Sequence, residues 1–183
     1  MNVNVLLFHQ FLELDAFGAL AVFKNLGFRH AYFSEQGGLI QGACGAQIST
    51  NAWQQMQGDI LFIPGGAGTR TLVQNRDFLA HLGPLCQSHQ YVLSVCTGSA
   101  LLAAAGVLDG KTATTNLNAF DWVKSLNPNV FFVKQRYCQD GKFFTSAGVS
   151  AGIDMALAFT RHLFDEEKAK EMARLIEYLP NEV

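Results

Sequence analysis

Tyr91–Ala100, with the sequence YVLSVCTGSA, is the stretch that decides the fold. Its first five residues are aromatic, β-branched or small, as is typical of a short buried strand. Cys96 follows directly, and a helix-forming run begins at Ala100, which is the layout of a nucleophile elbow. Ser94 and Gly98 are small enough for such a turn, which favours a reactive thiol over a merely buried apolar cysteine. Because the turn places the sulfur at the positive end of a helix, we expect the pKa of Cys96 to be lowered.

Length and composition exclude several classes of protein. The 183 residues contain no internal repeat or linker, so we expect one domain over residues 1–183. Apolar residues make up 49% and charged residues 15%, which indicates a globular chain. The net charge of −2 gives no reason to expect nucleic acid or an anionic membrane as a partner. With no signal peptide and no apolar run of membrane-spanning length, we expect a cytoplasmic protein.

The cysteine pattern indicates neither a metal site nor a disulfide framework. Cys44, Cys86, Cys96 and Cys138 form no CxxC pair, and no histidine cluster accompanies them. We therefore expect no metal and no cofactor. Reduced thiols also agree with a cytoplasmic location.

Strand patterns alternate with helix patterns along the chain. The predicted strands are 2–8, 29–34, 59–63, 91–95, 112–115 and 130–133. The predicted helices are 15–26, 77–88 with Asn75 as cap, a helix from residue 100, 117–125, 150–164, and 166–179, with Asp165 as cap and Pro180 beyond its end. Hairpins are predicted within 39–47 and around Asp140-Gly141. The fold class is therefore α/β, a flavodoxin-like three-layer sandwich: a mostly parallel sheet, helices on both faces and a small β-hairpin.

Ligands of such sheets bind beyond the carboxyl ends of the strands. Three loops leave those ends, at residues 9–15, 64–68 and 96–98. In the first loop, Asp15 could exchange a proton with a substrate or with the Cys96 thiol, or could simply cap the helix. Glu13 is its rival, although the spacing places the two carboxylates on different faces of the helix.

The second loop, Pro64–Gly68, lets backbone N–H groups approach a ligand closely. One of these groups, paired with the N–H of Thr97, could form an oxyanion hole. No Gly-Lys-Ser or Gly-Lys-Thr follows, so this is not a phosphate loop. Of the five histidines, His9 alone follows a strand at the right edge, and a lone histidine rarely takes part in chemistry.

Together these motifs resemble the ThiJ/PfpI superfamily, whose fold is shared with class I glutamine amidotransferase domains. Within the superfamily, the chain is similar to the isocyanide hydratase branch and to the sensor domains of certain AraC-type regulators. The matching segments are Leu14-Asp15 with Gly18, Asp59–Gly66, Ser94–Ser99, Ala113–Thr115 and Ser150–Leu157.

The resemblance implies roles for single residues. Cys96 would be the nucleophile and Asp15 its acid/base partner, with backbone N–H groups supplied by Gly66 and Thr97. Gly65, Asn116 and His9 could line the pocket or support this pair. The resemblance also implies a homodimer with the helix after the first strand near its interface, and a small-molecule substrate.

The chain departs from the family pattern at two positions. Asn116 stands where relatives usually have histidine after the Thr-Thr pair, and an amide cannot transfer protons as an imidazole can. Ala19 replaces a frequent proline. Thr97, where peptidase-like members have histidine, argues against peptidase chemistry.

The function that these residues suggest is hydration of a small apolar isocyanide through a thioimidate on Cys96. The alternative is a redox- or ligand-sensing domain without catalysis, in which Cys96 is the oxidisable element. An amidase or deglycase activity is a weaker third hypothesis, suggested by relatives alone.

Overall fold

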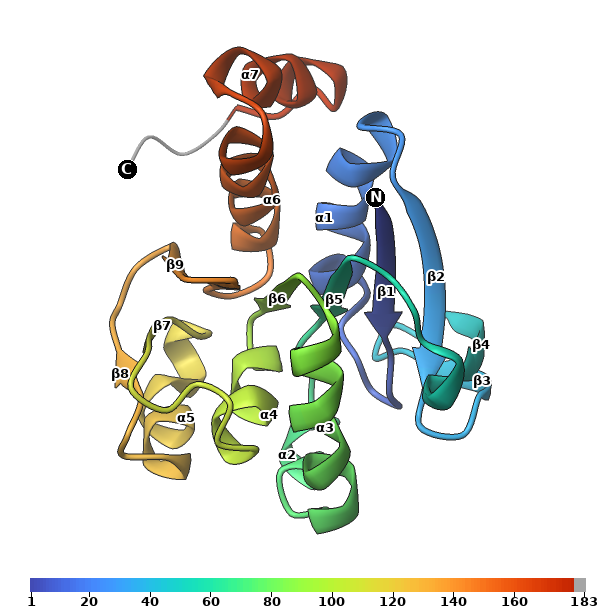
Figure 1. Cartoon of the computed structure of the whole chain (residues 1–183), viewed down its shortest axis with the longest axis vertical. Helices are drawn as coiled ribbons and strands as arrows, with labels where there is room; N and C mark the ends of the chain where they lie inside the picture. Colours follow the sequence, from blue (N-terminus) through green and yellow to red (C-terminus); the bar gives the residue numbers. More distant parts are fainter. Residues whose placement is uncertain (180–183) are drawn as a thin grey trace.

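The computed structural model describes residues 1–179, so Pro180 lies outside the described range. An eight-stranded sheet of order β3-β4-β2-β1-β5-β6-β10-β9 forms the centre of the molecule (Figure 1). Its strands are β1 (Asn2–Leu6), β2 (Arg29–Ser34), β3 (Gly38–Gln41), β4 (Gln47–Ala52), β5 (Ile60–Ile63), β6 (Tyr91–Val95), β9 (Tyr137–Asp140) and β10 (Phe143–Ser146). Neighbouring strands are parallel except at the two edges, where β3 and β9 run antiparallel to β4 and β10.

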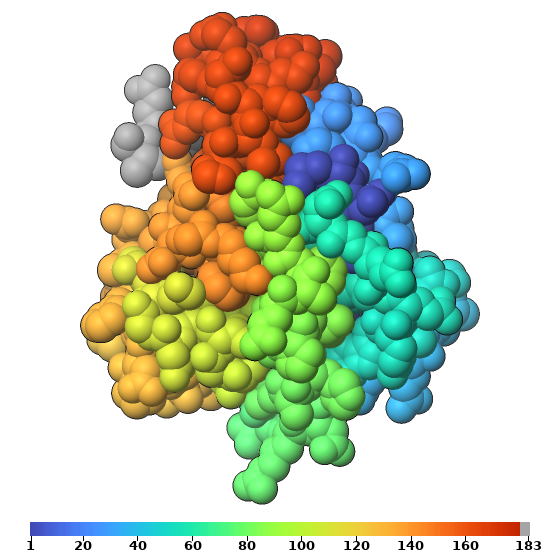
Figure 2. All heavy atoms as spheres, viewed as in Figure 1, coloured from blue at the N-terminus to red at the C-terminus, as the bar shows by residue number. Residues whose placement is uncertain are grey.

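Helices cover both faces of the sheet, which confirms the predicted three-layer architecture. They are α1 (Glu13–Asn25), α2 (Thr69–Leu72), α3 (Arg76–Ser88), α4 (Gly98–Ala104), α5 (Phe120–Leu126), α6 (Ala151–Leu163) and α7 (Glu166–Leu175), with short 3₁₀ turns η1 (Trp53–Gln55) and η2 (Leu117–Ala119). Helices α1, α6 and α7 pack against one another, while α4 contacts α2, α3 and α5. Figure 2 shows α3, in light green, as a ridge on the face of the molecule that also carries α2, α4 and α5. None of the helices among residues 1–179 is long and apolar enough to cross a membrane.

The central strands form where the sequence is apolar without interruption. All four residues of β5 are buried, and β6 is buried from Val92 onward. Continuous apolar runs are typical of parallel strands that are covered on both faces. Since β5 lies between β1 and β6, the loops that leave the carboxyl ends of these three strands meet at one edge of the sheet.

The predicted helix caps are confirmed. The side chain of Asn75 accepts a hydrogen bond from the N–H of Phe78 at the start of α3, and Asp165 accepts one from Lys168 at the start of α7. Helix α7 ends at Leu175, however, rather than at Leu179. Helix α1 begins at Glu13, so Asp15 lies in its first turn and is not its cap.

Several predicted strands are shorter or lie elsewhere. β1 ends at Leu6 rather than at Phe8. Residues 112–115 and 130–133 contribute only β7 (Thr112–Ala113) and β8 (Phe131–Phe132), which pair with each other in a separate two-stranded sheet. The hairpin expected within 39–47 is real but extends to Ala52, and its second strand pairs with β2. Sequence patterns did not predict the four-residue helix α2, which lacks a capping side chain.

Candidate active site

Cys96 occupies the predicted elbow between β6 and α4. Its φ of 57° lies in the left-handed region that non-glycine residues rarely adopt. The backbone is held there from both sides, because the Cys96 N–H donates to the carbonyls of Ser146 and Ala147 at 3.1 and 3.2 Å. The Cys96 carbonyl accepts from the hydroxyls of Ser99 and Thr115 at 3.1 and 3.0 Å. Such an over-determined, strained conformation is typical of a functional site.

Asp15 lies close to Cys96, as predicted. Its carboxyl group is fully buried, and Oδ2 accepts a hydrogen bond from the N–H of Gly65 at 3.0 Å. A Cβ atom added to Gly65 would lie 2.8 Å from Asp15 Oδ2, 2.8 Å from Cys96 Cβ and 2.6 Å from Thr97 N. The absence of a side chain at Gly65 therefore brings the carboxyl group and the elbow together.

The two groups compete for one proton. Burial raises the pKa of Asp15 to about 6, although hydrogen bonds from Cys96 and the Gly65 N–H act in the opposite direction. Burial and the negative charge of Asp15 raise the pKa of Cys96 to about 11. The expectation of a lowered thiol pKa is therefore wrong, since desolvation and a neighbouring carboxylate outweigh the amino end of the short helix α4. A coupled pair of this kind titrates as a unit.

The buried carboxyl group has one oxygen without a partner. Asp15 Oδ1 makes no hydrogen bond within the described part of the chain, whereas Oδ2 is held by Gly65. A buried carboxylate oxygen without a donor is costly unless it carries a proton. Oδ1 is therefore the oxygen suited to hold and release the proton.

Glu13, the rival carboxylate, has a structural role. Its side chain accepts hydrogen bonds from the N–H groups of Cys44 at 2.8 Å and Ala46 at 3.2 Å, in the loop between β3 and β4. Although burial raises the pKa of Glu13, these hydrogen bonds outweigh burial and hold it below its usual value. Glu13 thus anchors the hairpin and is not available to the thiol.

The backbone groups of Gly66 in the glycine-rich loop form hydrogen bonds within the protein, which the sequence did not predict. The Gly66 N–H donates to Thr97 Oγ1 at 3.0 Å, so in this arrangement it is not directed at a reacting atom. Thr69, the first residue of α2, donates its hydroxyl to the Gly66 carbonyl at 2.8 Å. Hydrogen bonding from the Thr97 N–H acts to lower the pKa of Cys96, although burial and the charge of Asp15 outweigh it. Thr69 was not foreseen, because its helix was not predicted.

His9 is separated from the thiol. Its Nδ1 accepts a hydrogen bond from the N–H of Gln41 at 3.2 Å, and the side chain is exposed. The ring lines a cavity of about 410 Å³ that also includes Phe8, Ile40 and Phe78 but neither Cys96 nor Asp15. Asn116, in contrast, donates from Nδ2 to Cys96 Sγ at 3.2 Å.

A second polar cluster braces the strand end that holds Cys96. Asp154 in α6 is buried, forms an ion pair with Arg136 and accepts a hydrogen bond from the Tyr178 hydroxyl at 3.0 Å. The Arg136 carbonyl accepts from the N–H of Ala147, whose own carbonyl accepts from Cys96. This geometry accounts for Asp154 within the Ser150–Leu157 segment. Ala147 and Thr115 also support the elbow, a role that the sequence did not identify.

The residues of the described part hold no cluster of three or more histidine, cysteine, aspartate or glutamate side chains arranged as metal ligands. The contacts around Cys96 bring together one thiol, the carboxyl group of Asp15 and the amide of Asn116. This set can perform nucleophilic addition with proton transfer.

Comparison with known proteins places this site in a family. The DJ-1/PfpI family model matches residues 1–162. The chain is 38% identical over 122 residues to an isonitrile hydratase of Pseudomonas putida, covering 67% of this chain and 53% of the hydratase. It is 31% identical over 137 residues to the HTH-type transcriptional regulator CdhR of Pseudomonas aeruginosa, covering 71% of this chain and 39% of the regulator. The chain thus spans about half or less of the length of these relatives.

Solved structures show the same fold. A crystal structure of a ThiJ/PfpI family protein from Pseudomonas syringae superposes with a TM-score of 0.89 at 27% identity, covering 99% of this chain and 76% of that one. A DJ-1 superfamily protein from Salmonella typhimurium, STM1931, superposes with a TM-score of 0.84 at 20% identity, covering 98% and 99% of the two chains. The latter was crystallised as a cysteine-to-alanine mutant.

Proposed function

Because this chain belongs to the DJ-1/PfpI family, we propose that it is a cysteine-dependent enzyme that adds water to a small apolar isocyanide and forms an N-substituted formamide. The observation that carries the proposal is the approach of Cys96 and Asp15 across Gly65. The 38% identity to an isonitrile hydratase supports this substrate class. Thr97 beside the thiol, in place of a histidine, supports a substrate that needs no protonation of an amine leaving group.

The first step forms a bond between sulfur and the terminal isocyanide carbon. At rest the pKa values of the pair place the proton on Cys96 and the negative charge on Asp15, and the reactive form arises when this proton moves from the sulfur to Asp15. As the thiolate attacks, Asp15 Oδ1 transfers its proton to the same carbon, which gives a neutral thioimidate and an Asp15 carboxylate. The isocyanide loses no group in this step.

The second step hydrolyses the thioimidate. The Asp15 carboxylate takes one proton from a water molecule, and the hydroxide adds to the carbon. The hydroxyl proton then moves to nitrogen, the carbon–sulfur bond breaks, and the formamide leaves. The sulfur departs as thiolate with Asp15 protonated, so the reactive form of the pair is restored. In this proposal the Thr97 N–H stabilises the negative charge that develops in each step, while Gly66 positions the Thr97 hydroxyl.

The test is turnover of an aryl isocyanide, with formamide followed by chromatography. We expect turnover by the wild-type protein and its loss in Cys96→Ala. Cys44→Ala is the matched control, because Cys44 is exposed on the hairpin and should leave turnover unchanged. Absence of turnover, or turnover that survives Cys96→Ala, would reject the proposal. A cytoplasmic location belongs to the same proposal, since a catalytic thiol stays reduced there.

A sensing role is the second candidate, favoured by the similarity to the regulator CdhR. In that case Cys96 would be oxidised reversibly without turning over a substrate. Mass spectrometry after mild peroxide treatment distinguishes the two. Selective, thiol-reversible oxidation at Cys96 in a protein that hydrates no isocyanide would support sensing. A deglycase activity, suggested by the 27% identity to the deglycase TK1284 of Thermococcus kodakarensis, ranks third.

A further inference from the structure

The amide of Asn116 has a defined orientation toward the sulfur. Asn116 precedes the 3₁₀ turn η2, and its Oδ1 accepts a hydrogen bond from the N–H of Asn118 at 2.9 Å. Because the oxygen is occupied by this donor, the NH₂ group is the part that faces Cys96, at 3.2 Å from Sγ. An amide NH₂ can only donate, so the sulfur is the acceptor in this contact.

Gly148 leaves the space in which this amide lies. A Cβ atom added to Gly148 would overlap Asn116 Nδ2. Gly148 follows Ala147, whose carbonyl holds the Cys96 N–H, so the loop between β10 and α6 supports both the backbone of the elbow and the donor to its sulfur.

We propose that Asn116 is a positioning residue that stabilises the thiolate form of Cys96 and so lowers the free-energy cost of moving the negative charge of the pair from Asp15 to the sulfur. A donor to sulfur stabilises the thiolate but offers nothing to the thiol form of Cys96 beyond a weak contact. The catalytic use of this stabilisation rests on the proposed function, because the addition requires the thiolate of Cys96 and the protonated form of Asp15. The stabilisation itself concerns the charge on sulfur, which can be measured without a substrate.

The groups around Cys96 come from five segments, one of which is the loop after β5, where Gly65 carries no ionisable group. Asp15 in α1 is titratable, and the Thr97 N–H at the start of α4 is a fixed donor. Asn116 is uncharged at every accessible pH. The loop between β10 and α6 contributes Ala147 and Gly148, which carry no ionisable group. The charge of Asn116 is therefore the same at every pH, whereas a histidine here would add a further titration.

The measurement is the rate of alkylation of Cys96 by iodoacetamide as a function of pH, with the modified peptide quantified by mass spectrometry. Peptide resolution is needed because Cys44 is exposed. In Asn116→Ala we expect the rate near pH 7 to fall about tenfold and the midpoint of the profile to rise by about one pH unit, the usual effect of one hydrogen bond to a charged group. The thiolate absorbance in the ultraviolet should fall in parallel. Leu117→Ala, an exposed residue of the same turn, is the matched control and should match wild type.

Asn116→Asp removes the donor to the sulfur but keeps the acceptor that stabilises the turn. An aspartate retains an acceptor for the Asn118 N–H but presents a carboxylate to the sulfur, so alkylation should be slower than in Asn116→Ala. Gly148→Ala displaces the amide by a different route and should lower the rate similarly, with little further loss in the double variant Asn116→Ala/Gly148→Ala.

Wild-type alkylation profiles in both Asn116→Ala and Asn116→Asp would overturn the inference. A changed profile in a protein that hydrates no isocyanide would leave the inference standing and reject only the proposed function. Conversely, isocyanide turnover with unchanged profiles would support the function and reject the role of Asn116.

Discussion

A single buried carboxyl group controls the pH behaviour of this site. Asp15 is fully buried, and its pKa rises from an ordinary value of 3.8 to about 6 because burial disfavours the charged form. A carboxyl group with a raised folded-state pKa binds its proton more tightly in the folded state. Its contribution to stability is therefore fully present below about pH 3.8 and is lost as the pH rises through about 6.

Asp15→Asn should consequently stabilise the fold while it removes catalysis. At about pH 8 we expect the free energy of unfolding to rise by up to about 3 kcal/mol, because no buried charge remains, and the gain should shrink toward pH 4. Urea unfolding at several pH values measures this difference. A loss of stability at pH 8 would show that the carboxylate is better compensated than its burial indicates.

Gly65→Ala tests the close approach of the two catalytic groups. The added methyl group would lie 2.6 Å from Thr97 N and 2.8 Å from both Asp15 Oδ2 and Cys96 Cβ. We therefore expect the free energy of unfolding to fall by about 1–3 kcal/mol and turnover to be lost. Gly110→Ala is the control, because Gly110 has a φ of 71° but open space around it. Gly110→Ala should lower the free energy of unfolding by about 1 kcal/mol and leave turnover unchanged. Equal activity in both variants would contradict the steric explanation.

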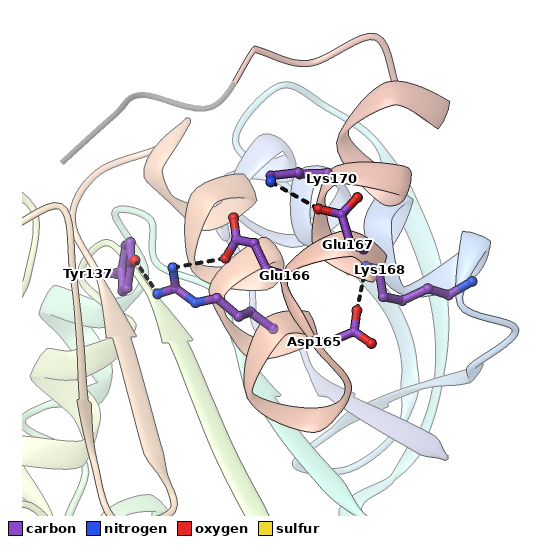
Figure 3. A network of polar contacts seen from close by, with 7 residues as sticks. Tyr137, Asp165, Glu166, Glu167, Lys168 and Lys170 are labelled. Atoms are coloured by element: carbon purple, nitrogen blue, oxygen red, sulfur yellow. Dashed lines mark hydrogen bonds and ion pairs between the residues drawn. The ribbon is translucent and has the colours of Figure 1, made fainter.

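At the level of elements, α7 shows which polar contacts hold a helix in place. Figure 3 shows the capping hydrogen bond that Asp165 accepts from the Lys168 N–H, beside the exposed ion pair of Glu167 with Lys170. The cap satisfies a backbone donor that the helix cannot satisfy internally. The ion pair joins two side chains that are largely exposed to solvent.

We therefore expect Asp165→Ala to destabilise the protein by about 1 kcal/mol, and Glu167→Ala to change stability by less than about 0.5 kcal/mol. Thermal unfolding of the two variants side by side provides the comparison. A larger effect of Glu167→Ala than of Asp165→Ala would reverse this ranking.

At the level of the whole molecule, we predict a homodimer, as the family resemblance implies. Leu14 is 47% exposed on α1, directly beside Asp15, and is an apolar side chain suited to an interface near the site. Light scattering should give a mass of twice the 20.0 kDa of one chain. Leu14→Glu should shift the mass toward the monomer, whereas Leu39→Glu, at an exposed leucine on the hairpin, should not. A monomeric wild type would refute the prediction.

Most strands of the central sheet were predictable from the sequence, but the separate pairing of β7 with β8 was not. Buried apolar runs and turn residues identified β2, β5 and β6, since these signals are local to each element. Residues 112–115 and 130–133 carry the same kind of signal, yet they pair in a separate small sheet. Which strands pair depends on contacts between distant segments, which no local pattern contains.

The sequence by itself determined the elbow at Cys96, the α/β architecture and the segment after the first strand that carries Asp15, because periodicity, turn residues and the shared edge of parallel strands are properties of order along the chain. Only the tertiary structure showed that Glu13 binds the hairpin, assigned the Gly66 N–H to Thr97 and turned the Asn116 amide toward the sulfur. It also reversed the expected direction of the Cys96 pKa. Burial and hydrogen-bond direction arise where residues distant in sequence meet, so they exist only in the folded molecule.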